Sequence, residues 1–361
     1  GASICVHLAA EQQQPYSINT AALLSAPCAG KLPTLSDTYD RSAAVAKALG
    51  CRDGDDVAVV RCVRSKSAAS VLAATDVDLG SGWGPTIDHH VISADIFDAL
   101  RANRRRLRGI QATMVGYDEN DAALFTLTTS KGRSMTEKEF DAALGALLGE
   151  EAAASVKKLY SELPPDWAPP PPLLPTTQWS FMFNRMYTDY AFACPALQLA
   201  DILTAAESGN GAAVPTWTYE FEHVGECTIV PLPSYYVAYL RAFHASELPY
   251  VFANAASGTC QLDAADDRKQ MLYTRDAFQL FGRTRAAPWP AYTHTARATA
   301  LLDNGAATVA NDVRAKQCAL WREIGAARAH VGDAVATAAA AAAAVNAALG
   351  AKGALSIAIN A

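Results

Sequence analysis

Short apolar runs bounded by polar turns predict β-strands at several points along the chain. Thr20 to Ala26 is an apolar run that stops at Pro27, a pattern typical of a buried central strand. Pro215 to Glu222 alternates and carries aromatic residues, so it also predicts a strand. Ala298 to Val309, with Asn304-Gly305 at its centre, predicts a β-hairpin.

Helical patterns occupy much of the remaining chain. Gly1 to Ala10 is typical of a buried helix, and Asp40 to Leu49 is amphipathic and ends at Gly50, a residue suited to a helix C-terminus. Residues 136–163 predict further helices. The tract at 335–345 is mostly alanine, the best intrinsic helix former, and is too weakly hydrophobic to cross a membrane.

Composition narrows the class of protein. The chain has 361 residues, of which 51% are hydrophobic, and a net charge of −6. Its basic residues form no run that would bind nucleic acid, and no stretch of about 18 apolar residues predicts a membrane span. The adjacent His89 and His90 lack a supporting cysteine or carboxylate cluster, so we expect no metal site.

A histidine segment carries the most specific signal. Arg241 to Phe252 reads RAFHASELPYVF. It resembles the H-G-x-E-[LI]-x-[FY]-V-F segment of type B carboxylesterases, the cholinesterase-like family. In that family this histidine is the general base of a Ser-His-acid triad. The resemblance assigns the base to His244, with Ala245 in place of the usual glycine and Glu247 as the carboxylate three positions on.

The acid of such a triad has a candidate in a second segment. Residues 111–125, QATMVGYDENDAALF, resemble the family pattern V-P-x-[LM]-[IV]-G-x-N-x-D-E-G-x-x-F. Aligning Gly116 and Phe125 places Asp121 at the catalytic acid, whose role is to orient the imidazole. Glu119 could serve instead if the turn is remodelled, and a solvated turn without catalytic role is the other alternative.

The serine of the triad has no match in the sequence. The G-x-S-x-G motif, which presents a serine above an α/β-hydrolase sheet, does not occur in it. Gly1 to Ala10 is similar to the segment that directly follows this motif in the family. The resemblance therefore covers the C-terminal two thirds of the domain. It implies that the N-terminal part, upstream in the protein or a separate chain, is a partner that supplies the serine.

Two disulfide bonds follow from the same resemblance. Cys51 and Cys62, followed by V-R-S, match one family bridge, although a pair of free buried thiols is the alternative. Cys194, in a T-D-x-x-F-x-C-P segment, and Cys318, before A-L-W, match a second bridge. Disulfides persist in oxidising compartments, so these pairs predict a secreted or lumenal protein.

The other cysteines are less constrained. Cys227 and Cys260 flank the histidine segment and are candidates for a third bridge, with the unpaired state equally open. We expect Cys5 and Cys28 to be free and buried, or partnered outside the chain.

Part of an acyl pocket is also implied. Residues 81–91 resemble the family's P-V-[IV]-D-G turn, with Asp88 at its aspartate. The residues just before this turn line the acyl pocket in the family, which here points to Leu79 and Ser81.

The resemblance implies an α/β-hydrolase fold over residues 1–325 and ester hydrolysis without a metal or organic cofactor. Two alternatives stay open: a neuroligin-like binding module and a structural subunit of an assembly. Residues 326–361 are expected to form an alanine-rich C-terminal helix that packs in an oligomer, or a frayed tail.

Overall fold

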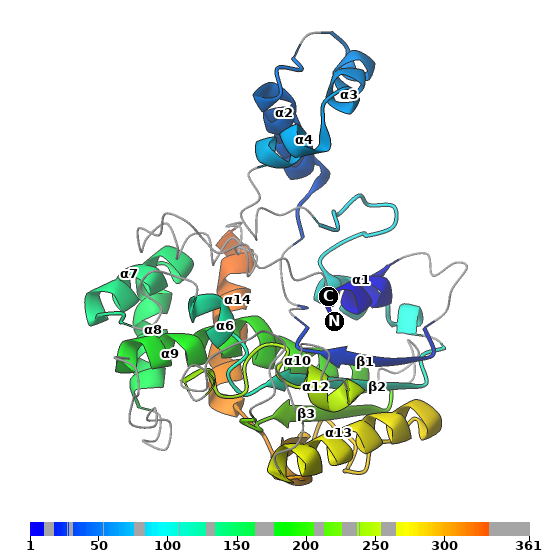
Figure 1. Ribbon diagram of the computed structural model, residues 1–361, viewed down its shortest axis with the longest axis vertical. Coiled ribbons are helices and arrows are strands. Elements are labelled where there is room, and N and C mark those ends of the chain that lie inside the picture. Colours follow the sequence, from blue (N-terminus) through cyan, green and yellow to red (C-terminus); the bar gives the residue numbers. More distant parts are fainter. Residues whose placement is uncertain are drawn as a thin grey trace.

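The structure is a computed structural model. It describes residues 1–10, 18–26, 28, 32–52, 54–75, 84–107, 109–127, 134–162, 177–205, 213–225, 237, 239–253 and 265–331. Across these residues the chain forms one sheet with helices packed against it (Figure 1).

The sheet has five strands in the order β1-β2-β3-β4-β5. The first four are mutually parallel, and β4 and β5 form an antiparallel hairpin. Their bounds are Thr20–Leu24 for β1, Ala112–Asp118 for β2, Thr216–Phe221 for β3, Ala298–Asp303 for β4 and Ala306–Asn311 for β5. All the strands predicted from the sequence are present, and the hairpin turns at Asn304-Gly305.

Strands β2 and β3 are buried along their whole length. Successive side chains of β2 point to opposite faces, so Val115 and Tyr117 join one apolar core while Ala112 and Met114 join another. Such two-sided burial is typical of parallel strands with helices on both faces. β1 differs from the predicted central strand, because it lies at one end of the described sheet and alternates between buried and half-buried positions.

Helices supply both cores. The core on one face includes Cys5 and Leu8 of α1 (Ala2–Ala9) and Leu199 and Leu203 of α10 (Cys194–Thr204). The core on the other face includes residues of α13 (Ala265–Thr284), which runs along β3 in Figure 1. This arrangement is the layered α/β architecture that the sequence predicted.

A small helical lobe projects from the body. It contains α2 (Leu35–Ala48), α3 (Asp56–Arg64) and α4 (Ala68–Ala74), at the top of Figure 1. Helix α2 starts five residues before the predicted Asp40, because the side chain of Thr34 caps the N–H of Asp37 and the Asp37 carboxylate accepts from the N–H of Thr34. Gly50 follows the helix with a positive φ of 74°, as expected.

The remaining helices lie mostly on the side of the sheet that carries α10. Helices α7 and α8 correspond to the prediction for residues 136–163 and are separated by Gly149, whose φ is 79°. Their bounds are α5 Ile96–Ala102, η1 Arg104–Leu107, α6 Ala123–Leu127, α7 Glu137–Leu148, α8 Glu150–Ser161, α9 Gln178–Thr188, η3 Asp189–Ala193, α12 Leu248–Phe252 and α14 Ala315–Val331. Segment η3 is a π-helical turn between α9 and α10 that the sequence did not predict.

Three disulfide bonds join cysteines of the described residues. Cys51–Cys62 and Cys194–Cys318 are formed as predicted, with Cα–Cα distances of 5.6 and 5.1 Å. The expectation for Cys5 and Cys28 was wrong, because these two are bonded to each other with a Cα–Cα distance of 5.8 Å. The bond joins α1 to the chain just after β1, a proximity that depends on tertiary packing. Cys227 and Cys260 lie outside the described residues.

The C-terminal region is described only in part. Helix α14 continues across the predicted division between residues 325 and 326, and residues 332–361 lie outside the described part. In the chain that the structure describes, no helix combines the length and the apolar character needed to cross a bilayer.

Candidate active site

The histidine loop lies between residue 240 and helix α12. Two non-glycine residues in it adopt positive φ, Arg241 at 57° and Ala245 at 67°. Ala245 stands where the resembled family pattern has glycine, and its left-handed backbone explains that preference, since only glycine adopts this conformation without steric cost. The tight bend directs the preceding His244 side chain toward the turn that follows β2.

His244 and Asp121 are in contact although 123 residues separate them in sequence. His244 Nδ1 lies 2.6 Å from Asp121 Oδ1, and the backbone N–H of His244 donates to the carbonyl of Asp121 at 3.2 Å. The second carboxylate oxygen of Asp121 accepts the N–H of Asp118 at 2.9 Å. An ionised carboxylate only accepts hydrogen bonds, so Nδ1 carries the proton and Nε2 presents its lone pair.

The imidazole is held between aromatic rings. Phe125 and Phe192 lie with ring centroids 5.1 and 5.2 Å from that of His244, and the histidine side chain keeps 14% of its surface exposed. Among the described residues, Nε2 makes no hydrogen bond. The ring is thus fixed in orientation while one nitrogen stays available to a reacting group.

The groups around His244 raise the pKa of its imidazole. Burial alone would lower the pKa of His244, but the hydrogen bond and the charge of Asp121 outweigh it, so the pKa lies above its usual value.

Glu119, the competing acid, lies elsewhere. Its carboxylate pairs with Arg241 at 2.9 Å and approaches Arg185 at 3.9 Å, and no contact with His244 is present. Distance alone therefore selects Asp121 as the partner of the imidazole.

Asn120 ties the turn to the histidine loop. Its side-chain amide donates to the carbonyl of Leu240 at 3.0 Å, and its backbone N–H donates to the carbonyl of Ala242 at 2.8 Å. The resembled family pattern has an acidic residue at the position of Asn120. In this structure an amide at that position donates to a loop carbonyl instead.

A buried network of ion pairs supports the turn that follows β2. Arg314 pairs with Asp189 and Glu220, and it also donates to the carbonyl of Glu119 at 3.0 Å. Tyr117 donates to Glu220 at 3.0 Å. Burial would raise the pKa of Glu220, but Arg314 outweighs it and keeps that pKa below its usual value. No local sequence signal marks Arg314, which lies 94 residues or more from its partners.

Two further carboxyl groups lie beside the pair. Asp118 and Glu247 are fully buried, and their side chains are within hydrogen-bonding range of each other. Burial and neighbouring negative charge raise the pKa of Asp118 well above its usual range and that of Glu247 to about 7. The sequence alone assigned no role to Glu247 and did not mark Asp118 as a site residue.

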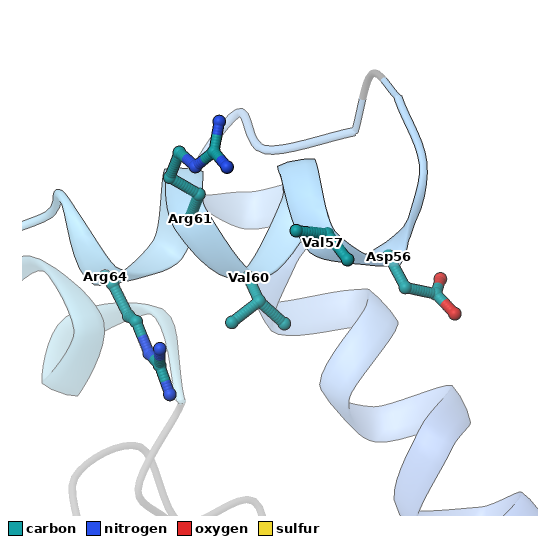
Figure 2. A pocket seen from close by; sticks show the side chains of 5 residues that line it. All are labelled: Asp56, Val57, Val60, Arg61 and Arg64. Carbon is teal, nitrogen blue, oxygen red and sulfur yellow. The ribbon is translucent and has the colours of Figure 1, made fainter.

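The predicted acyl-pocket residues Leu79 and Ser81 lie outside the described residues. A surface hollow of about 420 Å³ is present elsewhere, lined by Asp56, Val57, Val60, Arg61 and Arg64 (Figure 2). All five side chains belong to α3 in the projecting lobe at the top of Figure 1, whereas the ring of His244 contacts Phe125 of α6. The hollow is therefore separate from the candidate site.

In the part of the chain that the structure describes, no group of three or more histidine, cysteine, aspartate or glutamate side chains is arranged around a common metal position.

Comparison with known protein families identifies the family to which this chain belongs. A sequence model of the carboxylesterase family matches residues 1–321. The chain belongs to the carboxylesterase family. The pairing of His244 with Asp121 thus occurs in a carboxylesterase domain, on the two segments that carried the sequence resemblance.

Individual carboxylesterase relatives are distant. Mouse (Mus musculus) cholinesterase is 24% identical over 351 residues, which cover 89% of this chain and 53% of the relative. Para-nitrobenzyl esterase of Bacillus subtilis (strain 168) is 29% identical over 207 residues, covering 55% of this chain and 35% of the relative. The chain thus spans about half or less of the length of these curated relatives.

A solved structure supports the fold. The structure of a PNB esterase superposes with a TM-score of 0.63 at 23% identity, covering 88% of this chain and 61% of the other. The mostly parallel sheet with helices on both faces is that of an α/β-hydrolase, as the sequence predicted.

Proposed function

We propose that this protein hydrolyses carboxylic esters, with His244 as general base and Asp121 as the acid that orients it. The observation that supports the proposal is the 2.6 Å contact between His244 Nδ1 and Asp121 Oδ1. A histidine held by a buried carboxylate, with its other nitrogen available, is the arrangement that activates a hydroxyl nucleophile.

The reaction requires a serine, which we propose lies on an upstream part of the same domain. Nε2 of His244 takes the serine proton as the hydroxyl oxygen attacks the ester carbonyl. The imidazolium then donates that proton to the leaving alcohol, and an acyl-serine remains. Water hydrolyses the acyl-serine by the same steps, with His244 again as base. Asp121 stays ionised and stabilises the imidazolium.

Replacement of His244 tests this proposal. In the full-length protein, His244→Gln should reduce kcat/KM for a chromogenic para-nitrophenyl ester by about 10⁴-fold, because the serine loses its base. Glu119→Gln is the matched control, since Glu119 lies in the same turn and pairs with Arg241 instead. It should keep activity within about threefold. Undiminished hydrolysis in folded His244→Gln would refute the assignment.

We also infer an oxidising compartment, secreted or lumenal. Three disulfide bonds within the described residues support it, because reducing compartments do not maintain such bonds. Recovery of all six cysteines as free thiols from the native source would contradict it.

A further inference from the structure

Two buried carboxyl groups next to the His244–Asp121 couple have no role in the proposed reaction. Asp118 ends strand β2, and Glu247 precedes helix α12. Asp118 Oδ1 and Glu247 Oε2 are both shielded from solvent, and neither has a hydrogen-bond donor among the described residues. Buried carboxylate oxygens without donors are rare in folded proteins, so these two require an explanation.

The pair arises from one substitution in the family pattern. Glu247 matches the glutamate of the histidine segment, but Asp118 stands where the pattern of the acid segment has asparagine. An asparagine amide would donate to the glutamate. An aspartate puts a second carboxyl group in that place, and two ionised carboxylates in contact without a donor repel each other strongly in a buried site.

The surroundings do not supply the missing donor. Ser25 approaches the other oxygen of Asp118, Oδ2, at 3.5 Å, and the hydroxyls of Tyr219 and Ser246 are themselves without partners. The titratable groups that face the pair are Asp121, His244 and Tyr219. None of them donates to the two oxygens.

We propose that Asp118 and Glu247 share one proton and act as a positioning pair for the His244–Asp121 couple. One proton between the two groups removes one negative charge and gives each orphan oxygen a partner. The pair also connects both halves of the site. The backbone N–H of Asp118 holds Asp121, and the side chain of Asp118 lies near the backbone of Ala245, next to His244.

The shared proton limits the charge beside the imidazole. Each added negative charge raises the pKa of a neighbouring histidine and favours imidazolium, which cannot act as a base. With the proton retained, Asp118, Glu247 and Asp121 together carry two negative charges instead of three. This role rests on the proposed function, but the proton itself can be detected without any catalytic activity.

The experiment follows the side-chain carboxyl carbons by NMR as pH is varied in the full-length protein. In the unaltered protein the Glu247 carboxyl should titrate at about pH 7. In Glu247→Gln, which removes the second carboxyl group and supplies a donor, the Asp118 midpoint should fall by at least about one pH unit, a tenfold change in acidity. In Asp118→Asn, where Glu247 has no second carboxyl group to share a proton with, Glu247 should titrate in one step instead of two, which gives a second test if one variant folds poorly.

Glu222→Gln is the matched control. Burial and the charges of Glu220 and Glu119 raise the pKa of Glu222 to about 7, but none of the groups that perturb it belongs to the pair. This variant should leave the titration of Glu247 unchanged. Midpoints of Asp118 and Glu247 both near 4 in the unaltered protein, or an unchanged Asp118 midpoint in Glu247→Gln, would overturn the shared proton. A shifted midpoint in a protein without esterase activity would refute the proposed function and leave the pair intact.

Discussion

His223 shows how a single side chain in this protein can connect several structural elements through hydrogen bonds. His223 is buried at the end of β3 between two carboxylates, with Nε2 2.7 Å from Asp267 and Nδ1 3.0 Å from Asp303. Tyr250, on the helix that follows the histidine loop, donates to the same oxygen of Asp267 at 2.9 Å. His223 thereby connects β3, β4 and α13 to the segment that carries His244.

The charge of His223 should make stability depend on pH. Burial alone would lower the pKa of His223, but its hydrogen bonds to Asp267 and Asp303 outweigh it and raise that pKa above 6.5. The stabilisation is therefore complete below pH 6.5, the unfolded value, and is lost as pH rises through the folded value. His223→Gln should lower the free energy of unfolding more at pH 6 than at pH 9.

Urea unfolding at the two pH values measures this difference. His294→Gln is the control, because His294 is largely exposed and lies 3.8 Å from Asp201. It should change stability by less than about 0.5 kcal/mol at either pH. A larger cost of His223→Gln at pH 9 than at pH 6 would contradict the account.

Among the elements, the π-helical turn η3 has the widest influence on the site. It presents Phe192 to the His244 ring and Asp189 to Arg314, three positions apart. Tyr160 of α8 donates to the second oxygen of Asp189 at 2.6 Å. Widened turns of this kind occur frequently at functional sites, and here the turn connects the aromatic wall of the site to the buried ion network.

Removing Arg314, the cation of the buried ion network, should lower the stability of the protein. Arg314→Met leaves Asp189 and Glu220 buried without their counter-ion, and should lower the free energy of unfolding by about 3–5 kcal/mol. Arg322→Met is the matched control on the same helix, because Arg322 is partly exposed and only approaches Asp201 at 4.0 Å. Its cost should stay below about 1 kcal/mol. Equal costs for the two variants, measured by chemical denaturation, would argue against the network's importance.

Elements with a local signal could be predicted, and elements fixed by distant partners could not. The strand at 216–221 and the hairpin turn at Asn304-Gly305 follow from alternation and turn chemistry. Arg314 has no neighbour in sequence that marks it as buried, and Cys5 meets Cys28 only after α1 packs beside β1. The contact of His244 with Asp121 was expected from family resemblance, because spacing alone gives two residues so far apart no reason to meet.

At the scale of the whole molecule, the disulfide bonds close loops of very different lengths. Cys194–Cys318 closes a loop of 124 residues between α10 and α14, whereas Cys51–Cys62 closes 11 residues within the lobe. In the chain-entropy description, the stabilisation grows with the logarithm of loop length. The long bridge should therefore contribute more to global stability.

Paired alanine substitutions compare the two bridges. Removing Cys194 and Cys318 together should cost about 5 kcal/mol and removing Cys51 and Cys62 together about 3 kcal/mol. Chemical denaturation monitored by tryptophan fluorescence gives both values. A cost of the short bridge equal to or greater than that of the long one would show that native-state packing, and not loop length, decides the effect.

The hydrogen bonds between the acid turn and the histidine loop have a consequence for protein design. Backbone groups of Asp121 and Asn120 bind His244 and Ala242, so main-chain atoms fix the approach of the two segments. A transplanted site would need both segments with their backbone pairing, since copying the two side chains onto another scaffold would omit the bonds that set their distance. The smallest portable unit is therefore a pair of interlocked loops.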